Sequence, residues 1–458
     1  MSIDTLRYLA NMDSIHSFVP LTKILTASDI ERLASAGYVI GYTLDEFLEA
    51  FPGIDATKIY FNNGIVKTYY FDREQYIIFE LYLTGKDYQA MHGVDMQSYI
   101  SNAVAAFKRV ISEKGYGAVA FGLTDRLRME YIELLASDRV GDNIYQLFLD
   151  FYTMSDYGCS RMSLENLIKI ISSKSNDEIQ KTKNALRSFP ATVTLFRGEG
   201  EKSTPAEEAW SWTTDINQAY FFAARFSTEG ARVIKATVLK ENIVEYIGGN
   251  EKECLVNPKD INITDTIELH GMSFLDRLTR RIIPLYHRYR NLMLECSYYL
   301  DGDEHGEIHS ARVLLLSLIL AEIFGLSEKE RETLATAAIY HDIGRIHDGV
   351  DEDHGAESAK LYRGMCADDG GEYNLVAAFL MKYHSLPDEV GYSQITTPPM
   401  LSSNVERSRL LFNIFKDADA LDRVRFGIRD LDVNQLRLDI SKQLVLVAVL
   451  LFKNIKLS

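Results

Sequence analysis

Apolar and polar residues alternate with different spacings in different parts of the chain. In the first part, stretches rich in Tyr, Ile and Phe are typical of strands, whereas apolar residues three and four positions apart are typical of helices. We expect strands over residues 58–71 and 76–83, and helices over residues 29–36, 101–113 and 164–187. Residues 1–185 are therefore predicted to mix helices and strands.

The pattern changes twice further along. The middle part has short β-type runs, which predict strands over residues 191–196, 232–239 and 254–256, with a helix over 215–226. Beyond the middle part the apolar spacing is helical almost throughout. Residues 313–324 are apolar nearly all round, so they predict a central buried helix.

These changes predict an α+β, multidomain chain, since 458 residues suffice for two or three domains. Residues 1–185 would be a mixed α/β region, which either completes the next domain as a helical lobe or recognises a target. Residues 186–268 would form a small sheet domain. Residues 269–458 would form an all-α bundle.

Composition narrows the classes of function. The net charge of −16 disfavours a global phosphate-binding surface, so nucleic acid is not expected as the main ligand. The longest apolar run, residues 444–452, is far shorter than the roughly 20 residues that cross a bilayer. The N-terminus lacks the pattern of a signal peptide. We expect a cytoplasmic protein without a membrane segment, although delivery as a secreted effector would leave no such mark.

Cysteines and histidines are distributed very differently. The cysteines are scattered without metal-finger or redox spacing, and we expect reduced thiols at Cys159, Cys254, Cys296 and Cys366. In contrast, eight of the ten histidines lie at or after residue 270. This asymmetry points to chemistry in the last part of the chain.

The clearest chemical motif is an adjacent His-Asp pair. His341 and Asp342 end an apolar helical segment, AAIYHDIGR. Imidazole and carboxylate together suit a divalent metal ion. The chain supplies further ligand types in His309, within EIHSARV, and in Asp417, within KDADALDR. The sequence therefore predicts a metal site built from these four residues.

The order His, His-Asp, Asp over about residues 300–430 resembles the HD phosphohydrolase superfamily. The resemblance implies a helical bundle in which His309, His341, Asp342 and Asp417 bind the metal, with Asp342 also a catalytic group. It implies one or two divalent ions, chosen among Mn, Fe, Ni, Zn and Mg. The chemistry would be cleavage of a phosphomonoester, a phosphodiester or a pyrophosphate.

Other residues near this motif receive separate expectations. His354 and His384 stand where some members of the superfamily place ligands of a second metal or groups that bind the substrate phosphate. We expect Asp419 and Asp422 to be capping or hydrogen-bonding partners and not ligands. Three further histidines are expected to be surface or supporting residues: His287, His305 and His347.

The middle region contains a second set of motifs, LFRGEG at 195–200, WSWTTD at 210–215 and NEKECLVNP at 250–258. Their order resembles the arginine-serine-glutamate class of ADP-ribosyltransferases, which have a split sheet and use NAD as substrate. The middle motif departs from that class, because Thr-Thr-Asp replaces Ser-Thr-Ser. By this resemblance, NAD is bound by Arg197, Gly198, Thr213 and Thr214, and the catalytic carboxylates are Glu251 and Glu253.

The chemistry of NAD cleavage fits these residue types. Breaking the nicotinamide–ribose bond develops positive charge on the ribose, which a nearby carboxylate stabilises. The forked guanidinium of Arg197 suits a pyrophosphate. If Glu251 and Glu253 lie on one strand, they point to the same side and reach one site.

Three hypotheses follow for function. The first is a bifunctional enzyme, in which an NAD-dependent ADP-ribosyltransferase modifies an unknown protein or nucleotide target and the phosphohydrolase processes the ADP-ribosyl or nucleotide product. The second is a nucleotide or phosphodiester hydrolase with a non-catalytic, nucleotide-sensing transferase-like domain. The third is an interaction protein with degenerate sites. By analogy alone, the first would suit a bacterial effector or a defence system.

Overall fold

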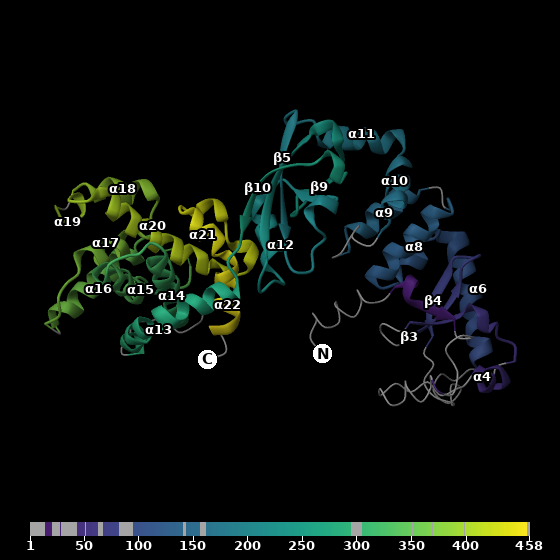
Figure 1. Cartoon of the computed structure of the whole chain (residues 1–458), viewed down its shortest axis with the longest axis horizontal. Helices are drawn as coiled ribbons and strands as arrows, with labels where there is room; N and C mark the ends of the chain where they lie inside the picture. The colour runs from purple at the N-terminus through teal and green to yellow at the C-terminus, as the bar shows by residue number, and fades with distance from the viewer. Residues whose placement is uncertain are drawn as a thin grey trace. The chain divides into compact units, whose positions relative to one another are not determined.

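The computed structural model describes residues 14–20, 28, 44–50, 52–62, 67–81, 95–140, 143–155, 162–294, 305–349, 351–368, 370–397 and 399–455. The chain divides into two compact units, Met1–Asn184 and Ala185–Ser458 (Figure 1). Within the described part, no helix is long and apolar enough to cross a membrane. The predicted division of the second unit near residue 268 stays a prediction.

A four-stranded antiparallel sheet begins the first unit, in the order β1 (Phe18–Pro20), β2 (Ile59–Asn62), β3 (Lys67–Asp72) and β4 (Ile77–Leu81). The strands predicted over 58–71 and 76–83 are therefore confirmed, the first as two strands. Helix α6 (Met96–Lys114) buries Ile100 against Phe79 and neighbouring apolar residues of this sheet. The Asp95 carboxylate caps α6 by accepting from the Ser98 amide.

Helices fill the rest of the first unit. Its other described helices are α4 (Leu44–Ala50), α7 (Gly117–Phe121), α8 (Asp125–Ser137), α9 (Ile144–Tyr152), α10 (Leu164–Ser172) and α11 (Asn176–Ala185). The helix predicted over 164–187 is two helices, because Ser175 starts a new one by accepting from the Glu178 amide while Glu178 accepts from the Ser175 amide. The helix predicted over 29–36 falls outside the described residues.

A six-stranded antiparallel sheet begins the second unit, in the order β10-β7-β5-β6-β9-β8. Its strands are β5 (Thr192–Glu199), β6 (Ser211–Thr213), β7 (Arg232–Leu239), β8 (Ile243–Ile247), β9 (Glu253–Val256) and β10 (Asn262–Glu268). Helix α12 (Ile216–Ala224) packs against β5 (Figure 1). This approach requires Gly198, because a Cβ there would lie 1.9 Å from the Ala219 carbonyl oxygen.

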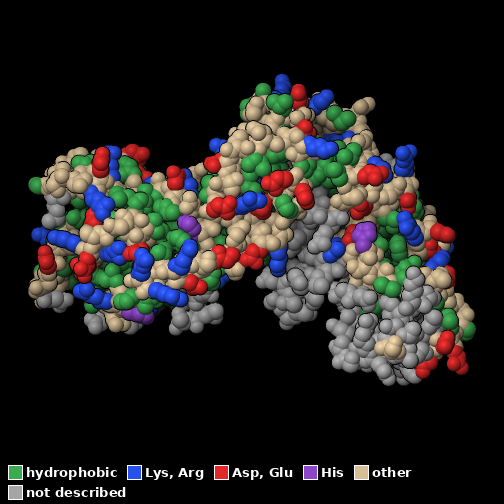
Figure 2. All heavy atoms as spheres, in the orientation of Figure 1, with side chains coloured by type: hydrophobic (Ala, Val, Ile, Leu, Met, Phe, Trp, Pro, Cys, Tyr) green, Lys and Arg blue, Asp and Glu red, His purple; other side chains and the backbone are tan. Residues whose placement is uncertain are grey.

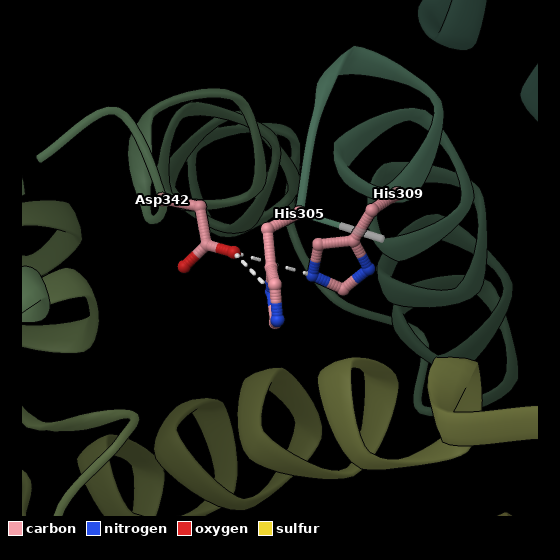
Figure 3. A group of neighbouring side chains, drawn as sticks. All are labelled: His305, His309 and Asp342. Carbon is pink, nitrogen blue, oxygen red and sulfur yellow. Dashed lines mark hydrogen bonds and ion pairs between the residues drawn. The ribbon is translucent and has the colours of Figure 1, made fainter. Parts of the chain in front are cut away.

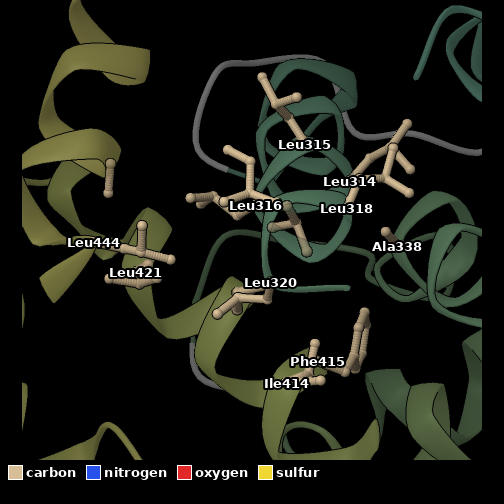
Figure 4. Close-up of a cluster of buried hydrophobic side chains, with 14 of the residues drawn as sticks. Leu314, Leu315, Leu316, Leu318, Leu320, Ala338, Ile414, Phe415, Leu421 and Leu444 are labelled. Carbon is tan, nitrogen blue, oxygen red and sulfur yellow. The ribbon is translucent and has the colours of Figure 1, made fainter. Parts of the chain in front are cut away.

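A helical region follows the sheet in the chain and shares a hydrophobic core with α12. Its helices are α13 (Met272–Leu294), α14 (Glu307–Ile323), α15 (Glu328–Tyr340), α16 (His354–Asp368), α17 (Leu375–Tyr383), α18 (Asp388–Ile395), α19 (Pro399–Ser402), α20 (Val405–Leu421), α21 (Asp439–Gln443) and α22 (Val445–Ile455). The predicted central helix is α14, whose leucines are surrounded by side chains from α15 and α20 and by Leu444 (Figure 4). One hydrophobic core joins these helices to α12.

On the face that Figure 2 draws, acidic and basic groups of the described residues are interspersed. Several basic side chains of α13 pair with acidic neighbours, including Arg281 with Glu322 and Arg290 with Glu307. The basic side chains of α13 that make these ion pairs therefore have structural partners on the protein surface.

Candidate metal centre

The ends of five helices meet at one buried point and bring imidazole and carboxylate groups together. His341 is the C-cap of α15, and Asp342 follows it directly. The other helices contribute His309 in the first turn of α14, His354 at the start of α16, His384 as the C-cap of α17 and Asp419 in the last turn of α20. Helix ends can place adjacent residues around one ion, which a helix interior cannot do.

Oxygen acceptors fix the orientation of four imidazole rings. In each ring Nδ1 lies against an oxygen, so Nδ1 holds the hydrogen and donates. These contacts are His309 with Asp422 Oδ2 at 2.7 Å, His341 with Ala338 O at 2.9 Å, His384 with Met381 O at 2.7 Å, and His354 with Asp351 O. In a neutral ring with this tautomer, Nε2 holds a lone pair directed away from these oxygens.

The Nε2 atoms converge in two pairs. His309 and His341 bring theirs to 3.2 Å, and His354 and His384 bring theirs to 3.0 Å. Two lone pairs at such distances repel each other unless a cation lies between or beside them. The arrangement fits divalent metal ions, which neutral imidazoles bind through one nitrogen while the other donates to a fixed oxygen.

Asp342 lies between the two pairs and is only 3% exposed. Its Oδ1 is 3.2 Å from His354 Nε2 and 3.7 Å from His384 Nε2. Its Oδ2 is 3.6 Å from His309 Nε2 and 3.8 Å from His341 Nε2. Burial alone would raise the pKa of Asp342, but the nearby histidines outweigh burial and hold that pKa well below its ordinary value. One ionised carboxylate thus faces both pairs of nitrogens.

The carboxylate that α20 contributes is Asp419, in place of the predicted Asp417. Asp419 Oδ1 lies 3.3 Å from His309 Nε2, and Asp419 joins His309 and His341 in a group able to hold a metal. Asp417 instead accepts hydrogen bonds from the amides of Arg437 and Leu438 and from the Arg437 guanidinium. Residues two apart on a helix point about 200° apart, so both carboxylates cannot face the same ion.

The pKa of Asp419 is also shifted. Burial acts to raise it, but the close contact with His309 and the electrostatic effect of the other nearby histidines lower it by more. Asp419 is therefore ionised, as a metal ligand must be. Asp419 is thus a hydrogen-bonding partner, as expected, and it also belongs to a group of side chains that could hold a metal ion.

Asp422 and His305 complete the surroundings of His309. Asp422 is buried and accepts from Arg312 as well as from His309, which matches its expected role as a hydrogen-bonding partner. His305 was expected at the surface or as a supporting residue, but its Nδ1 lies 3.3 Å from Asp342 Oδ2, and Figure 3 shows its ring beside His309. Because His305 precedes the first turn of α14, no helical spacing ties it to the motif.

The sheet brings together part of the second set of predicted residues. The Arg197 guanidinium donates to the carbonyl oxygens of Ser211 and Thr204, each at 2.8 Å. The Ser211 hydroxyl in turn donates to Glu253, which is only 9% exposed. Strands β5, β6 and β9 therefore connect Arg197 and Glu253 through Ser211, a residue that the sequence-based prediction omitted.

Other predicted residues of this set have local structural partners. The Thr213 and Thr214 hydroxyls donate to the carbonyl oxygens of Glu251 and Lys252. Glu251 lies in the turn before β9, where Lys252 has a positive φ of 46°, and its carboxylate pairs with Arg429 at 3.0 Å. Glu251 and Glu253 therefore do not lie on one strand, so strand alternation does not direct both carboxylates to one site.

Comparison with known proteins identifies only the helical part. No curated protein and no solved structure matches the chain. Residues 306–424 match the family model described as HD domain, and they contain His309, His341, Asp342 and Asp419. This match, together with the metal-ligand cluster, indicates an HD domain of the kind found in metal-dependent phosphohydrolases.

Proposed function

We propose that residues 306–424 hold two divalent ions, one on each side of Asp342, and hydrolyse a phosphate ester. The main support is the pairing of Nε2 atoms, with one Asp342 oxygen facing each pair. The first ion would be held by His309, His341, Asp342 and Asp419, and the second by His354, His384 and Asp342. Asp419 replaces Asp417 in this ligand set.

The residues of the site have separable roles. Divalent ions would make water more acidic and offset negative charge on a phosphoryl group. Burial lowers the pKa of His341 to about 3, so its ring stays neutral and keeps a lone pair for a ligand bond. Asp422 holds His309 in the required tautomer, and Arg312 balances the charge of Asp422.

The test uses purified protein loaded in turn with Mn, Fe, Ni, Zn or Mg. Hydrolysis of a phosphomonoester, a phosphodiester and a pyrophosphate is measured for the wild type, for His341→Ala and for His287→Ala. His287 is an exposed histidine of α13 and serves as the matched control. We expect His341→Ala to lose metal and hydrolysis and His287→Ala to keep both. Equal hydrolysis by His341→Ala and wild type would refute the proposal.

We also propose that the sheet binds NAD and transfers its ADP-ribosyl group. The support is the hydrogen-bonded path from Arg197 through Ser211 to Glu253. In this proposal Ser211 acts beside Glu253 in place of Thr213 and Thr214, and the Glu253 carboxylate stabilises charge on the ribose. The alternative remains a domain that senses a nucleotide without transferring it.

Glu253→Gln separates these two possibilities, with Glu268→Gln on the exposed strand β10 as the control. Two independent catalytic sites are supported if Glu253→Gln alone loses nicotinamide release from NAD and still hydrolyses phosphate esters. Absence of NAD turnover in the wild type supports the sensor. If NAD labelled in the adenylate phosphate gives the same labelled products with wild type and with His341→Ala, the two activities do not act in sequence.

A further inference from the structure

Arg425 is a buried cation at the edge of the metal cluster, and some of its guanidinium nitrogens have no hydrogen-bond partner among the described residues. It lies at the end of the 3-10 helix Asp422–Arg425, and its side chain is 6% exposed. Within the described residues, its Nε and Nη1 have no hydrogen-bond partner. Leaving buried donors unpaired is costly, so such groups in a native protein usually have a ligand.

Arg425 faces the metal cluster through His305. Its Nη2 lies 3.5 Å from His305 Nδ1, and the same His305 atom is 3.3 Å from Asp342 Oδ2. Its Nη1 is 3.5 Å from Asp422 Oδ2, an ion pair without hydrogen-bonding geometry. The guanidinium also lies 4.3 Å from the centre of the Phe426 ring, which restricts its movement.

A second arginine approaches the cluster from the loop after Asp342. Arg345 Nε is 3.7 Å from Asp342 Oδ2 and, like Nε of Arg425, has no hydrogen-bond partner within the described part of the chain. Its Nη1 donates to the Gly349 carbonyl oxygen at 2.9 Å, which fixes the guanidinium. Arg312 differs, because Asp422 accepts from both its Nε and Nη2, so it has a structural partner already.

Once the carboxylates of the cluster are matched with Arg312 and a metal ion, the positive charges of Arg345 and Arg425 have no matching negative charge. Arg312 balances Asp422, and a single divalent ion would balance Asp342 and Asp419. Arg345, Arg425 and any second ion then remain as surplus positive charge. A surplus of this sign at a buried position favours a ligand with two negative charges over one with a single charge.

From this geometry we propose that Arg425, with Arg345, binds the non-bridging oxygens of a terminal phosphate group. The substrate class is then a compound with a terminal, dianionic phosphate, such as a phosphomonoester, and not a phosphodiester. The inference rests on the proposed phosphohydrolase function and adds to it the phosphate-binding residues and the substrate class. Guanidinium forks bind phosphate oxygens with paired, charge-assisted hydrogen bonds.

The experiment measures binding of inorganic phosphate and of dimethyl phosphate to the metal-loaded full chain by calorimetry. Wild type is compared with Arg425→Met, with Arg345→Met and with Arg423→Met, an exposed arginine two residues away that serves as the control. We expect each of the first two variants to weaken phosphate binding by about 10- to 100-fold, and Arg423→Met to leave it unchanged. Dimethyl phosphate should bind the wild type at least tenfold more weakly than phosphate.

Metal content and hydrolysis, measured on the same samples, separate the two proposals. The inference is overturned if Arg425→Met binds phosphate like the wild type, if it loses the metal ions, or if the diester binds as tightly as phosphate. Phosphate binding that depends on Arg425, in a chain that hydrolyses no phosphate ester, would leave the inference standing and refute the proposed hydrolase. If Arg425→Met does not fold, Arg425→Lys provides the test, with a smaller loss of phosphate affinity expected because a fork is replaced by a point charge.

Discussion

Exchanging one carboxylate at a time on α20 separates metal binding from folding. Asp417 is fully buried and accepts from the Arg437 amide at 3.0 Å, from the Leu438 amide at 2.9 Å and from the Arg437 guanidinium at 3.1 Å. Asp417→Asn removes the charge and one acceptor oxygen. Arg437 keeps its pairing with Asp388, which limits the loss. We expect a cost of about 2–4 kcal/mol in unfolding free energy.

Asp419→Asn should have the opposite effect, with metal affinity lowered and the stability of the metal-free protein nearly unchanged. Asp419→Asn removes a proposed ligand that contacts His309, and among the described residues no arginine pairs with Asp419 as Arg437 pairs with Asp417. We therefore expect the melting temperature of the metal-free variant to stay within a few degrees of that of the wild type. The metal affinity should fall by about 100-fold or more, which exceeds the loss typical of a residue that only hydrogen-bonds to a metal ligand. Asp417→Asn should lower that temperature by about 5–15 °C and leave the metal content of the folded protein unchanged.

The assay combines differential scanning calorimetry of metal-free protein with metal analysis after equilibration against a buffered Mn²⁺ series. Both variants replace a carboxylate with an amide on the same helix, so each controls for the other. A folded Asp417→Asn variant without metal binding, together with an Asp419→Asn variant that binds metal like the wild type, would contradict this choice of ligand.

Three further changes test packing and charge elsewhere in the second unit. Leu320→Ala, at a fully buried position in the last turn of α14, should cost about 2–5 kcal/mol in urea unfolding; a cost below 1 kcal/mol would contradict the packing described. Gly344→Ala should destabilise by about 1–3 kcal/mol, because its Cβ would lie 2.4 Å from the Ser358 amide nitrogen, and a neutral result would show that the loop can move freely. The hydrogen bond from Arg407 chiefly lowers the pKa of Glu330 to about 2, so its stabilisation is present above about pH 4.3 and disappears as the pH falls towards 2. The unfolding free energies of wild type and Glu330→Gln should therefore differ by about 1–2 kcal/mol at pH 6 and converge near pH 2, and a pH-independent difference would exclude this cause.

Much of the secondary structure could be predicted because apolar spacing is a local property. Strand β7 and the buried helix α14 follow directly from the spacing of Val, Ile and Leu. The break between α10 and α11 was missed, because it depends on the reciprocal hydrogen bonds of Ser175 and Glu178 and not on apolar spacing. The strand pairing of Glu253 with Thr213 could not be predicted, since it joins distant segments.

The metal cluster was predicted in part. His309, His341 and Asp342 stand out in the sequence, whereas the choice between Asp417 and Asp419 depends on which way α20 faces. Asp419 and Asp422 are three residues apart and therefore share a helix face, a spacing that favours Asp419 over Asp417. The contribution of His305 depends on a loop and gave no signal in the sequence.

The most direct test of the metal centre is anomalous diffraction from crystals of the full chain grown with Mn²⁺. We predict two anomalous peaks, one within bonding distance of His309, His341 and Asp419 and the other within bonding distance of His354 and His384, with Asp342 between them. A well-ordered structure with no peak at this cluster, or with an ion bound by Asp417, would contradict the account.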